Sequence, residues 1–201
     1  MSLSYTGLAN YHRSPHSYIN KCMGVETPET DAMRLGKAVH ALVQDHCMGV
    51  KKDERLKDLE WNFTSKEWHC RRTCADGIIL HGYIDLVNFK SKMLCEIKTG
   101  SSGMSQKEFD ELVQWKYYAY VTGFRKVLFL SLETAGTPED IYIKKIHTEY
   151  REVTDKDVQE ATEWAATAIE GIKAGRFYDD LEGGRCQRGR ECPYANYCLF
   201  I

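Results

Sequence analysis

Two short apolar segments joined by a polar, turn-like link most constrain how this chain folds. Residues 78–87 and 93–98 are rich in aliphatic and aromatic residues, a pattern that predicts the two arms of a β-hairpin. The first arm carries Asp85, and the second arm carries Glu96 and Lys98. Because side chains alternate between the two faces of a strand, Glu96 and Lys98 are expected to share one face of the sheet.

The two carboxylates of this hairpin suggest a metal site. Asp85 and Glu96 would oppose each other on adjacent strands, where like charges normally repel. A divalent cation removes this penalty, and carboxylate oxygens are ligands that suit Mg²⁺ or Mn²⁺. Lys98 beside such an ion would orient a water molecule or stabilise negative charge on a phosphate. A solvated hairpin with ordinary surface charges explains these three residues alone equally well. The choice between a metal site and a solvated hairpin therefore depends on the flanking segments.

The segment before the hairpin predicts an amphipathic helix over residues 33–43, with Asp31 as its N-cap. Gly36 lacks a side chain and would let this helix approach another backbone closely. His40 lies four residues later, on the same face of the helix. A single histidine in such a helix is most often a core residue, so its interpretation depends on its companions.

The segment after the hairpin predicts a further helix over residues 105–122. Ser105 and Glu108 form a capping-box pattern at its start. Gln114 and Tyr118 are four residues apart and therefore share a face of this helix. Packing on the helix surface is the simple alternative for these two residues.

Taken in order, these residues resemble the motif set of the PD-(D/E)XK nucleases, specifically their RecB-like branch. That branch has a helical Gly-x-x-x-His, an Asp on one strand, Glu-x-Lys on the next strand and Gln-x-x-x-Tyr on the following helix. The corresponding residues here are Gly36 and His40, Asp85, Glu96 and Lys98, and Gln114 and Tyr118. Ile84 stands where the family nominally has proline. Residues 11–18 (Tyr-His-Arg-Ser-Pro-His-Ser-Tyr), followed by residues 33–43, are also similar to the opening of the RecE-type (exonuclease VIII) phage nucleases.

The resemblance implies a restriction-endonuclease-like core of the α/β (α+β) class, with a central mixed β-sheet flanked by helices. It also implies metal-dependent hydrolysis of phosphodiester bonds in DNA, as an exonuclease in recombination, repair or end processing. The metal ligands that it implies for Mn²⁺ or Mg²⁺ are His40, Asp85, Glu96 and the backbone carbonyl of Ile97. The catalytic residues that it implies are Asp85, Glu96, Lys98, Gln114 and Tyr118.

The eight cysteines of the 201 residues form a second pattern. Cys186, Cys192 and Cys198 recur at intervals of six near the end of the sequence, and Cys22 precedes the predicted core. This layout resembles the RecB-like nucleases with an iron–sulfur cluster, including AddB-type nuclease domains and CRISPR-associated RecB-like exonucleases. The resemblance implies a [4Fe–4S] cluster on these four thiolates, in a tail packed near the N-terminal helices; zinc is the alternative, since four thiolates suit both metals. Buried, inert thiols are expected for Cys47, Cys70, Cys74 and Cys95.

Composition favours one domain over residues 1–201, because this length permits a sizeable core and no repeat interrupts it. With no evident signal peptide or membrane-spanning segment, a cytoplasmic location and no membrane partner are expected. The net charge of −2 is not that of a strongly basic nucleic-acid-binding protein, but local basic groups such as Arg71 and Arg72 leave DNA as the expected partner. The aromatic run at residues 117–120 offers rings that would stack on bases.

Two other functions compete with an independent nuclease. In the first, the chain binds DNA ends as a subunit of a larger complex, for example in recombination or CRISPR spacer acquisition, and cuts only with protein partners. In the second, the cysteines form a redox or regulatory module, and the Asp85, Glu96 and Lys98 set is incidental.

Overall fold

The computed structural model describes residues 1–25 and 28–177, together with the backbone of two short strands, β7 (Leu181–Glu182) and β8 (Arg185–Cys186). A mixed six-stranded sheet runs in the order β1-β3-β4-β5-β6, with β2 paired to β3. Its strands are β1 (Ser2–Ser4), β2 (Ser65–Thr73), β3 (Ile79–Asn88), β4 (Met93–Gly100), β5 (Lys126–Gly136) and β6 (Ile141–Glu152). The helices are α1 (Tyr5–Arg13), α2 (Pro15–Cys22), α3 (Asp31–Cys47), the 3-10 turn η1 (Glu54–Leu56), α4 (Gln106–Glu111), α5 (Val113–Thr122) and α6 (Asp155–Lys173).

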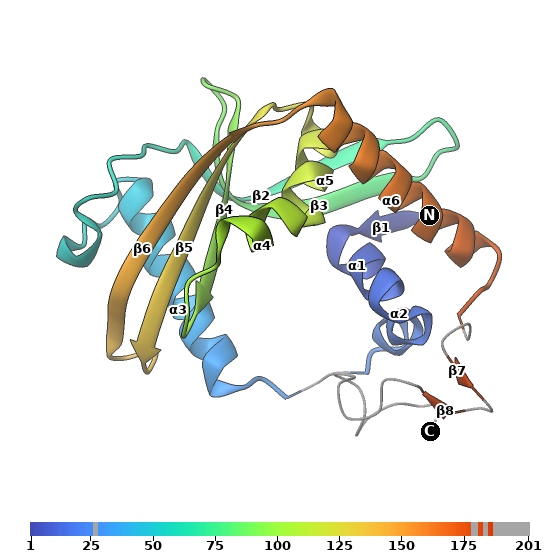
Figure 1. The fold of residues 1–201 in the computed structure, drawn as a ribbon, viewed down its shortest axis with the longest axis horizontal. Helices are drawn as coiled ribbons and strands as arrows, with labels where there is room; N and C mark the ends of the chain where they lie inside the picture. Colours follow the sequence, from blue (N-terminus) through green and yellow to red (C-terminus); the bar gives the residue numbers. More distant parts are fainter. Residues whose placement is uncertain (26–27, 178–180, 183–184, 187–201) are drawn as a thin grey trace.

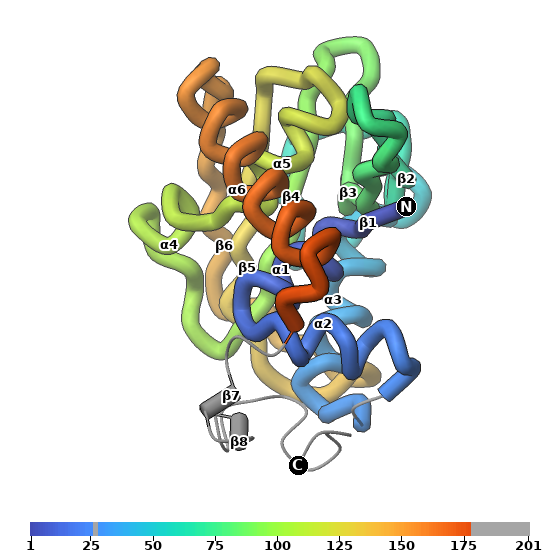
Figure 2. The backbone as a smooth tube through the Cα atoms, turned by 90° about the vertical axis from the view of Figure 1, so that its right-hand side faces the viewer, coloured from blue at the N-terminus to red at the C-terminus, as the bar shows by residue number. Residues whose placement is uncertain are grey.

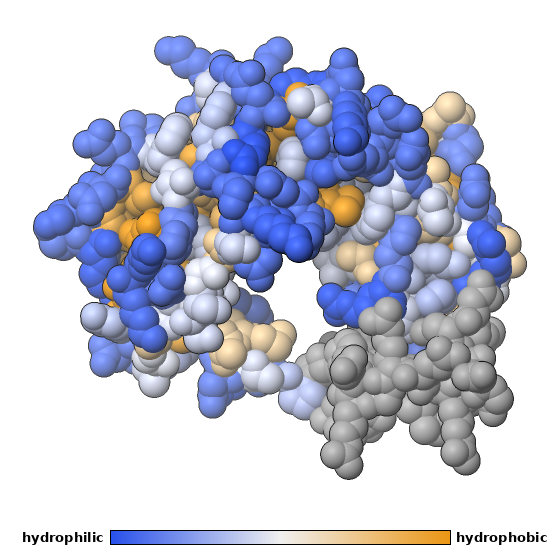
Figure 3. All heavy atoms as spheres, in the orientation of Figure 1, coloured by the Kyte–Doolittle hydropathy of each residue, from blue (hydrophilic) through white to orange (hydrophobic). Residues whose placement is uncertain are grey.

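Helices cover both faces of the sheet. Figure 1 shows α3 behind β5 and β6, and α4, α5 and α6 in front of the strands. Two apolar cores result, one between the sheet and α1, α5 and α6, and the other under α3. Figure 3 shows the molecule hollowed near its centre, with hydrophilic side chains gathered above the hollow, over α4. The mixed sheet flanked by helices confirms the predicted fold class.

The predicted hairpin is present as β3 and β4, but the two strands are paired over a short stretch. Their ladder ends at Leu86 and Cys95, and β1 pairs with residues 79–81 at the other end of the same edge of β3. Residues 82–85 are thus left without a ladder partner on this edge within the described chain. The sheet is therefore open at the position of Asp85.

Strand β3 also changes face at Asp85. Ile84 is buried in the core beneath α5, whereas Leu86 is buried in the core beneath α3. In a regular strand, residues two apart lie on the same face, so the backbone is distorted between these positions. Gly82 lies against α5, because a Cβ there would stand 2.6 Å from Cε1 of Tyr118.

Two predicted helix boundaries were wrong in detail. The cap of α3 is Thr30 rather than Asp31: the Thr30 side chain accepts a hydrogen bond from the Met33 amide, and Asp31 is the first helical residue. The helix predicted over residues 105–122 is divided into α4 and α5 by Leu112, whose backbone is extended. The Trp115 indole donates to the Phe109 carbonyl at 3.0 Å, an oxygen that also accepts from the Leu112 amide at 3.1 Å, so α5 is tied back to α4 at the break. The capping box of Ser105 and Glu108 is confirmed.

The described cysteines outside the predicted cluster are mostly core residues. Cys47, Cys70 and Cys95 are buried, as predicted, whereas Cys74 is half-buried. Among the helices that the structure describes, none has both the length and the apolar composition needed to cross a bilayer.

Candidate active site

The sequence-predicted residues of helices and strands converge at the open position of the sheet. Asp85 lies on β3, Glu96 and Lys98 on β4, His40 on α3 and Gln114 on α5. The Nδ1 atom of His40 stands 3.6 Å from Oδ1 of Asp85. Residues as far apart in the sequence as positions 40 and 114, a separation of 74, are therefore brought together around Asp85.

The Asp85 carboxylate takes the place of a missing ladder bond. Its Oδ2 accepts a hydrogen bond from the Ile97 amide at 2.7 Å, just beyond the point where the β3–β4 ladder ends. This bond fixes the carboxylate against the backbone of β4 and leaves Oδ1 directed to His40. On the side of β4, Asp85 is therefore held by its side chain rather than by a backbone ladder bond.

A chain of polar contacts links Glu96 to α5. The Lys98 ammonium donates to Oε1 of Glu96 at 2.6 Å and to Oε1 of Gln114 at 2.6 Å. The Gln114 amide in turn donates to the Tyr118 hydroxyl at 3.5 Å, a long contact. The expected shared face of Glu96 and Lys98 is confirmed, and Gln114 holds the lysine from the other side.

Burial makes the Glu96 carboxylate costly to ionise. The residue is only 4% exposed, and Oε2 has no hydrogen-bond partner among the described atoms. Burial, followed by the nearby Asp85 charge, raises the pKa of Glu96 to about 7, although Lys98 and His40 oppose this rise. A buried acceptor without a partner beside a second carboxylate is an arrangement that a cation would stabilise.

His40 responds to the same charges. Burial acts to lower its pKa, but the nearby carboxylates, first that of Asp85 and then that of Glu96, outweigh burial, so the pKa of His40 is raised. The imidazole therefore carries positive charge more readily than a free histidine does. Binding a metal through Nδ1 would require the neutral imidazole, so metal binding and protonation of His40 would compete.

The donor set fits a divalent metal in composition, although its side chains are not in coordinating positions. Across the described residues, no three His, Cys, Asp or Glu side chains are grouped closely enough to hold an ion as they stand. Lys98 pairs with one oxygen of Glu96, and the Ile97 amide occupies one oxygen of Asp85. The free oxygens are Oε2 of Glu96 and Oδ1 of Asp85, the latter facing His40.

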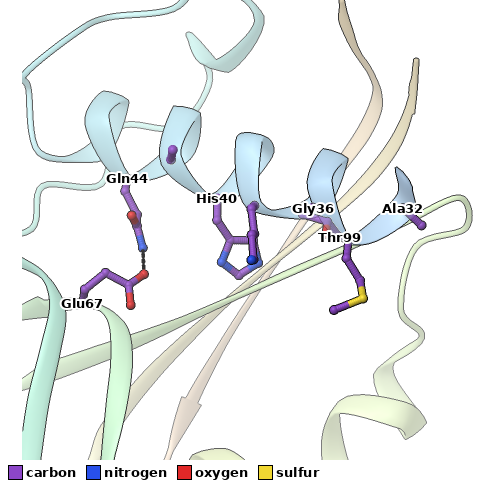
Figure 4. Close-up of a pocket in the computed structure, with 9 residues that line it drawn as sticks. Ala32, Gly36, His40, Gln44, Glu67 and Thr99 are labelled. Carbon is purple, nitrogen blue, oxygen red and sulfur yellow. Dashed lines mark hydrogen bonds between the residues drawn. The ribbon is translucent and has the colours of Figure 1, made fainter. Parts of the chain in front are cut away.

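A groove of about 670 Å³ runs beside His40, between α3 and the strands. Figure 4 shows His40 at its centre and Gln44, one turn later on α3, hydrogen-bonded to Glu67 of β2. Gln44 Nε2 donates to Glu67 Oε1 at 2.5 Å and to the Asp85 carbonyl at 3.2 Å. At Gly36 the close neighbour is a side chain rather than the backbone that was predicted, since a Cβ there would lie 3.1 Å from Thr99 Oγ1.

Gln44 and Glu67 were missed by the sequence analysis. The spacing of four residues between His40 and Gln44 was a usable signal, because such residues share a helix face. Glu67 offered none: its positive φ of 47° places it at a local irregularity of β2 that alternation does not reveal.

The remaining predicted residues have different outcomes. Tyr117 and Tyr118 are buried, so the suggestion that they stack on bases was wrong; their rings pack between α5, α1 and the sheet. Cys22 is an exposed thiol at the end of α2. Cys192, Cys198 and the side chain of Cys186 lie outside the described residues.

The fold and site define a nuclease-like α/β protein, with carboxylates and a lysine where two strands of a mixed sheet separate. The family model described as the PD-(D/E)XK nuclease superfamily matches residues 51–199, and the chain belongs to this superfamily. By family it is therefore a nuclease, with DNA as the implied substrate. Nucleases of this superfamily typically use Mg²⁺ or Mn²⁺.

Solved structures share the same fold. The crystal structure of SSO0001 has a TM-score of 0.57 and 16% identity, and the match covers 98% of this chain and 86% of that one. The alkaline exonuclease LHK-Exo from Laribacter hongkongensis has a TM-score of 0.58 and 12% identity, with 88% and 90% of the two chains covered. LHK-Exo in complex with dAMP gives a TM-score of 0.57 and 14% identity, with 89% and 91% covered. A comparison with curated proteins gave no match.

Proposed function

We propose that this chain is a divalent-metal-dependent DNA exonuclease that acts in recombination, repair or end processing. The observation that carries the proposal is the convergence of His40, Asp85, Glu96 and Lys98 where β3 and β4 separate. The likeness to LHK-Exo supports cutting from an end, since that protein is described as an alkaline exonuclease and was solved with dAMP. We also retain the prediction that residues 1–201 form one domain.

The proposed roles follow from the contacts. His40, Asp85, Glu96 and the Ile97 carbonyl would hold Mn²⁺ or Mg²⁺, which supplies an acidified water and polarises the scissile phosphate. Lys98 would orient the attacking water and stabilise the negative charge that develops on the phosphate. Gln114 would keep the Lys98 ammonium in place, because its carbonyl oxygen accepts from Nζ at 2.6 Å. Tyr118 would position Gln114 through its hydroxyl.

The imidazole of His40 favours Mn²⁺ over Mg²⁺, since nitrogen ligands raise the affinity for transition metals. The purified chain should therefore degrade end-labelled DNA with Mn²⁺, more slowly with Mg²⁺, and not at all with EDTA. Gel analysis of single- and double-stranded substrates measures both the metal requirement and the products. DNA binding without cleavage under every metal condition would instead favour the end-binding subunit of a larger complex.

The proposal includes a [4Fe–4S] cluster on Cys22, Cys186, Cys192 and Cys198, with zinc as the alternative. Its support is the cysteine spacing and the exposed Cys22 thiol, which is accessible to a metal. We expect Cys192→Ser to lower the bound iron and acid-labile sulfide, and Cys74→Ser, a control outside the cluster, to leave them unchanged. Metal and sulfide analysis of anaerobically purified protein checks this, and zinc in place of iron in the parent protein would contradict the cluster assignment.

A further inference from the structure

A strip of polar and aromatic side chains, three of them exposed and one half-buried, lies on β2 and β3 beside the candidate active site. We call it the β2–β3 strip; it consists of His69, Arg71, His81 and Tyr83. Leu80 and Ile84 are buried, and Gly82 lies against Tyr118 of α5. The alternate residues of β3 therefore point to the other face of the sheet. Figure 2 shows both α5 and α6 on one side of β2 and β3.

The members of the strip contact one another across the two strands. His69 pairs with Tyr83 and Arg71 pairs with His81 in the β2–β3 register. The rings of His69 and Tyr83 are stacked, with centroids 4.8 Å apart and planes inclined by 17°. His69 Nε2 lies 3.2 Å from His81 Nδ1, within hydrogen-bond distance. The strip is thus an ordered surface of stacked rings, with an arginine beside it.

The exposed tyrosine and arginine of this strip distinguish it from a surface that packs against another helix or strand. Tyr83 keeps 57% of its area exposed although it is stacked on His69, and Arg71 is also exposed. Burial, followed by the neighbouring His69, lowers the pKa of His81, so this ring becomes charged less readily than a free histidine. Arg71 supplies the fixed positive charge of the strip.

The strip begins at the candidate active site. Tyr83 precedes Asp85 by two residues on the same strand, a separation of about 7 Å at the usual rise per residue. On β2, Glu67 precedes His69 by two residues and lines the groove beside His40. This separation is comparable to the length of one to a few nucleotides, so a strand that reaches Asp85 would also pass Tyr83.

We propose that the β2–β3 strip binds single-stranded nucleic acid, as a platform for the unpaired bases of the strand that is cut. A base would stack on the His69–Tyr83 pair, and Arg71 would contact a backbone phosphate. The proposal rests on the proposed nuclease function and specifies its substrate at this site. An unpaired strand fits because the faces of duplex bases are already stacked on one another, whereas an open sheet face presents its rings to splayed bases.

The test compares Tyr83→Ala with Tyr83→Phe and with Tyr142→Ala. Tyr142 is a matched control, since it is 63% exposed on β6, at the far edge of the sheet from β2. Fluorescence anisotropy with a labelled oligothymidylate in EDTA measures binding without cleavage. Tyr83→Ala should weaken binding about tenfold, and Tyr83→Phe and Tyr142→Ala should bind as the parent protein does, because stacking needs only the ring.

The same variants are assayed with Mn²⁺ on bis(p-nitrophenyl) phosphate, a diester too small to reach the strip. Tyr83→Ala should hydrolyse it at the parent rate, which also shows that the variant is folded. If Tyr83→Ala binds oligothymidylate as the parent protein does, or loses affinity only for blunt duplex DNA, the proposed base-binding role of the strip is wrong. A parent protein that cleaves neither the diester nor DNA, yet loses oligothymidylate binding on Tyr83→Ala, would overturn the nuclease proposal and leave the platform standing.

Discussion

Asp85→Asn should reduce Mn²⁺-dependent DNA hydrolysis by about 10³-fold or more, because an amide is a poor ligand for a hard cation and a bound metal supplies several kcal/mol of catalysis. The fold should survive. The asparagine carbonyl oxygen can still accept from the Ile97 amide, the bond that now fixes the Asp85 side chain at 2.7 Å. Initial rates on end-labelled DNA measure the loss, and the thermal unfolding midpoint reports the fold.

Asp76→Asn is the matched control for this substitution. Asp76 pairs with Lys173 at the surface, away from the contacts that join His40, Asp85 and Glu96. Its rate should equal that of the parent protein. Parent-like hydrolysis by the Asp85 variant would exclude the assigned site even if the chain is a nuclease.

Glu96→Gln should abolish hydrolysis and, without metal, stabilise the protein at alkaline pH. Burial and Asp85 raise the folded-state pKa of Glu96 from 4.5 to about 7. Below pH 4.5 the carboxyl is protonated in both the folded and the unfolded states, so its contribution to stability is fully present. As the pH rises to about 7, the unfolded state ionises first, and this contribution is lost. The loss is on the order of 2–3 kcal/mol in the free energy of unfolding.

Urea unfolding in EDTA at pH 5 and pH 8 checks this prediction. The parent protein should lose stability between the two values, and Glu96→Gln should lose less. Glu139→Gln, which changes an exposed acid, should behave as the parent protein does. His40 also has a raised pKa and contributes a pH dependence of the same sign; part of that rise comes from Glu96, so Glu96→Gln reduces both contributions in the same direction. A parent protein whose stability does not fall between pH 5 and pH 8 would show that the pKa of Glu96 is not raised in the metal-free fold.

Local sequence rules were sufficient for the parts of the site within one element. Alternation placed Glu96 and Lys98 on one face, and the spacing of four placed Gly36 with His40 and Gln114 with Tyr118. Each of these relations depends only on the repeat of a helix or a strand.

The features that escaped prediction depend on contacts between distant segments. The change of face in β3 at Asp85 coincides with the gap between the β1 and β4 ladders on one edge, and no local pattern encodes that gap. The break at Leu112 likewise depends on its surroundings, where Trp115 closes back onto α4. The three-residue strand β1 is too short to show a period, and the pairing of Gln44 with Glu67 needs the packing of α3 on β2.

The short strand β1 has a consequence for handling the protein. It covers residues 79–81 of β3, and the Met1 carbonyl accepts from the Ile79 amide at 2.9 Å. Proteolytic trimming of this segment would expose backbone donors and acceptors along β3, and uncovered strand edges recruit other chains. Clipped preparations should therefore self-associate, and intact mass is a sensible check before any kinetic measurement.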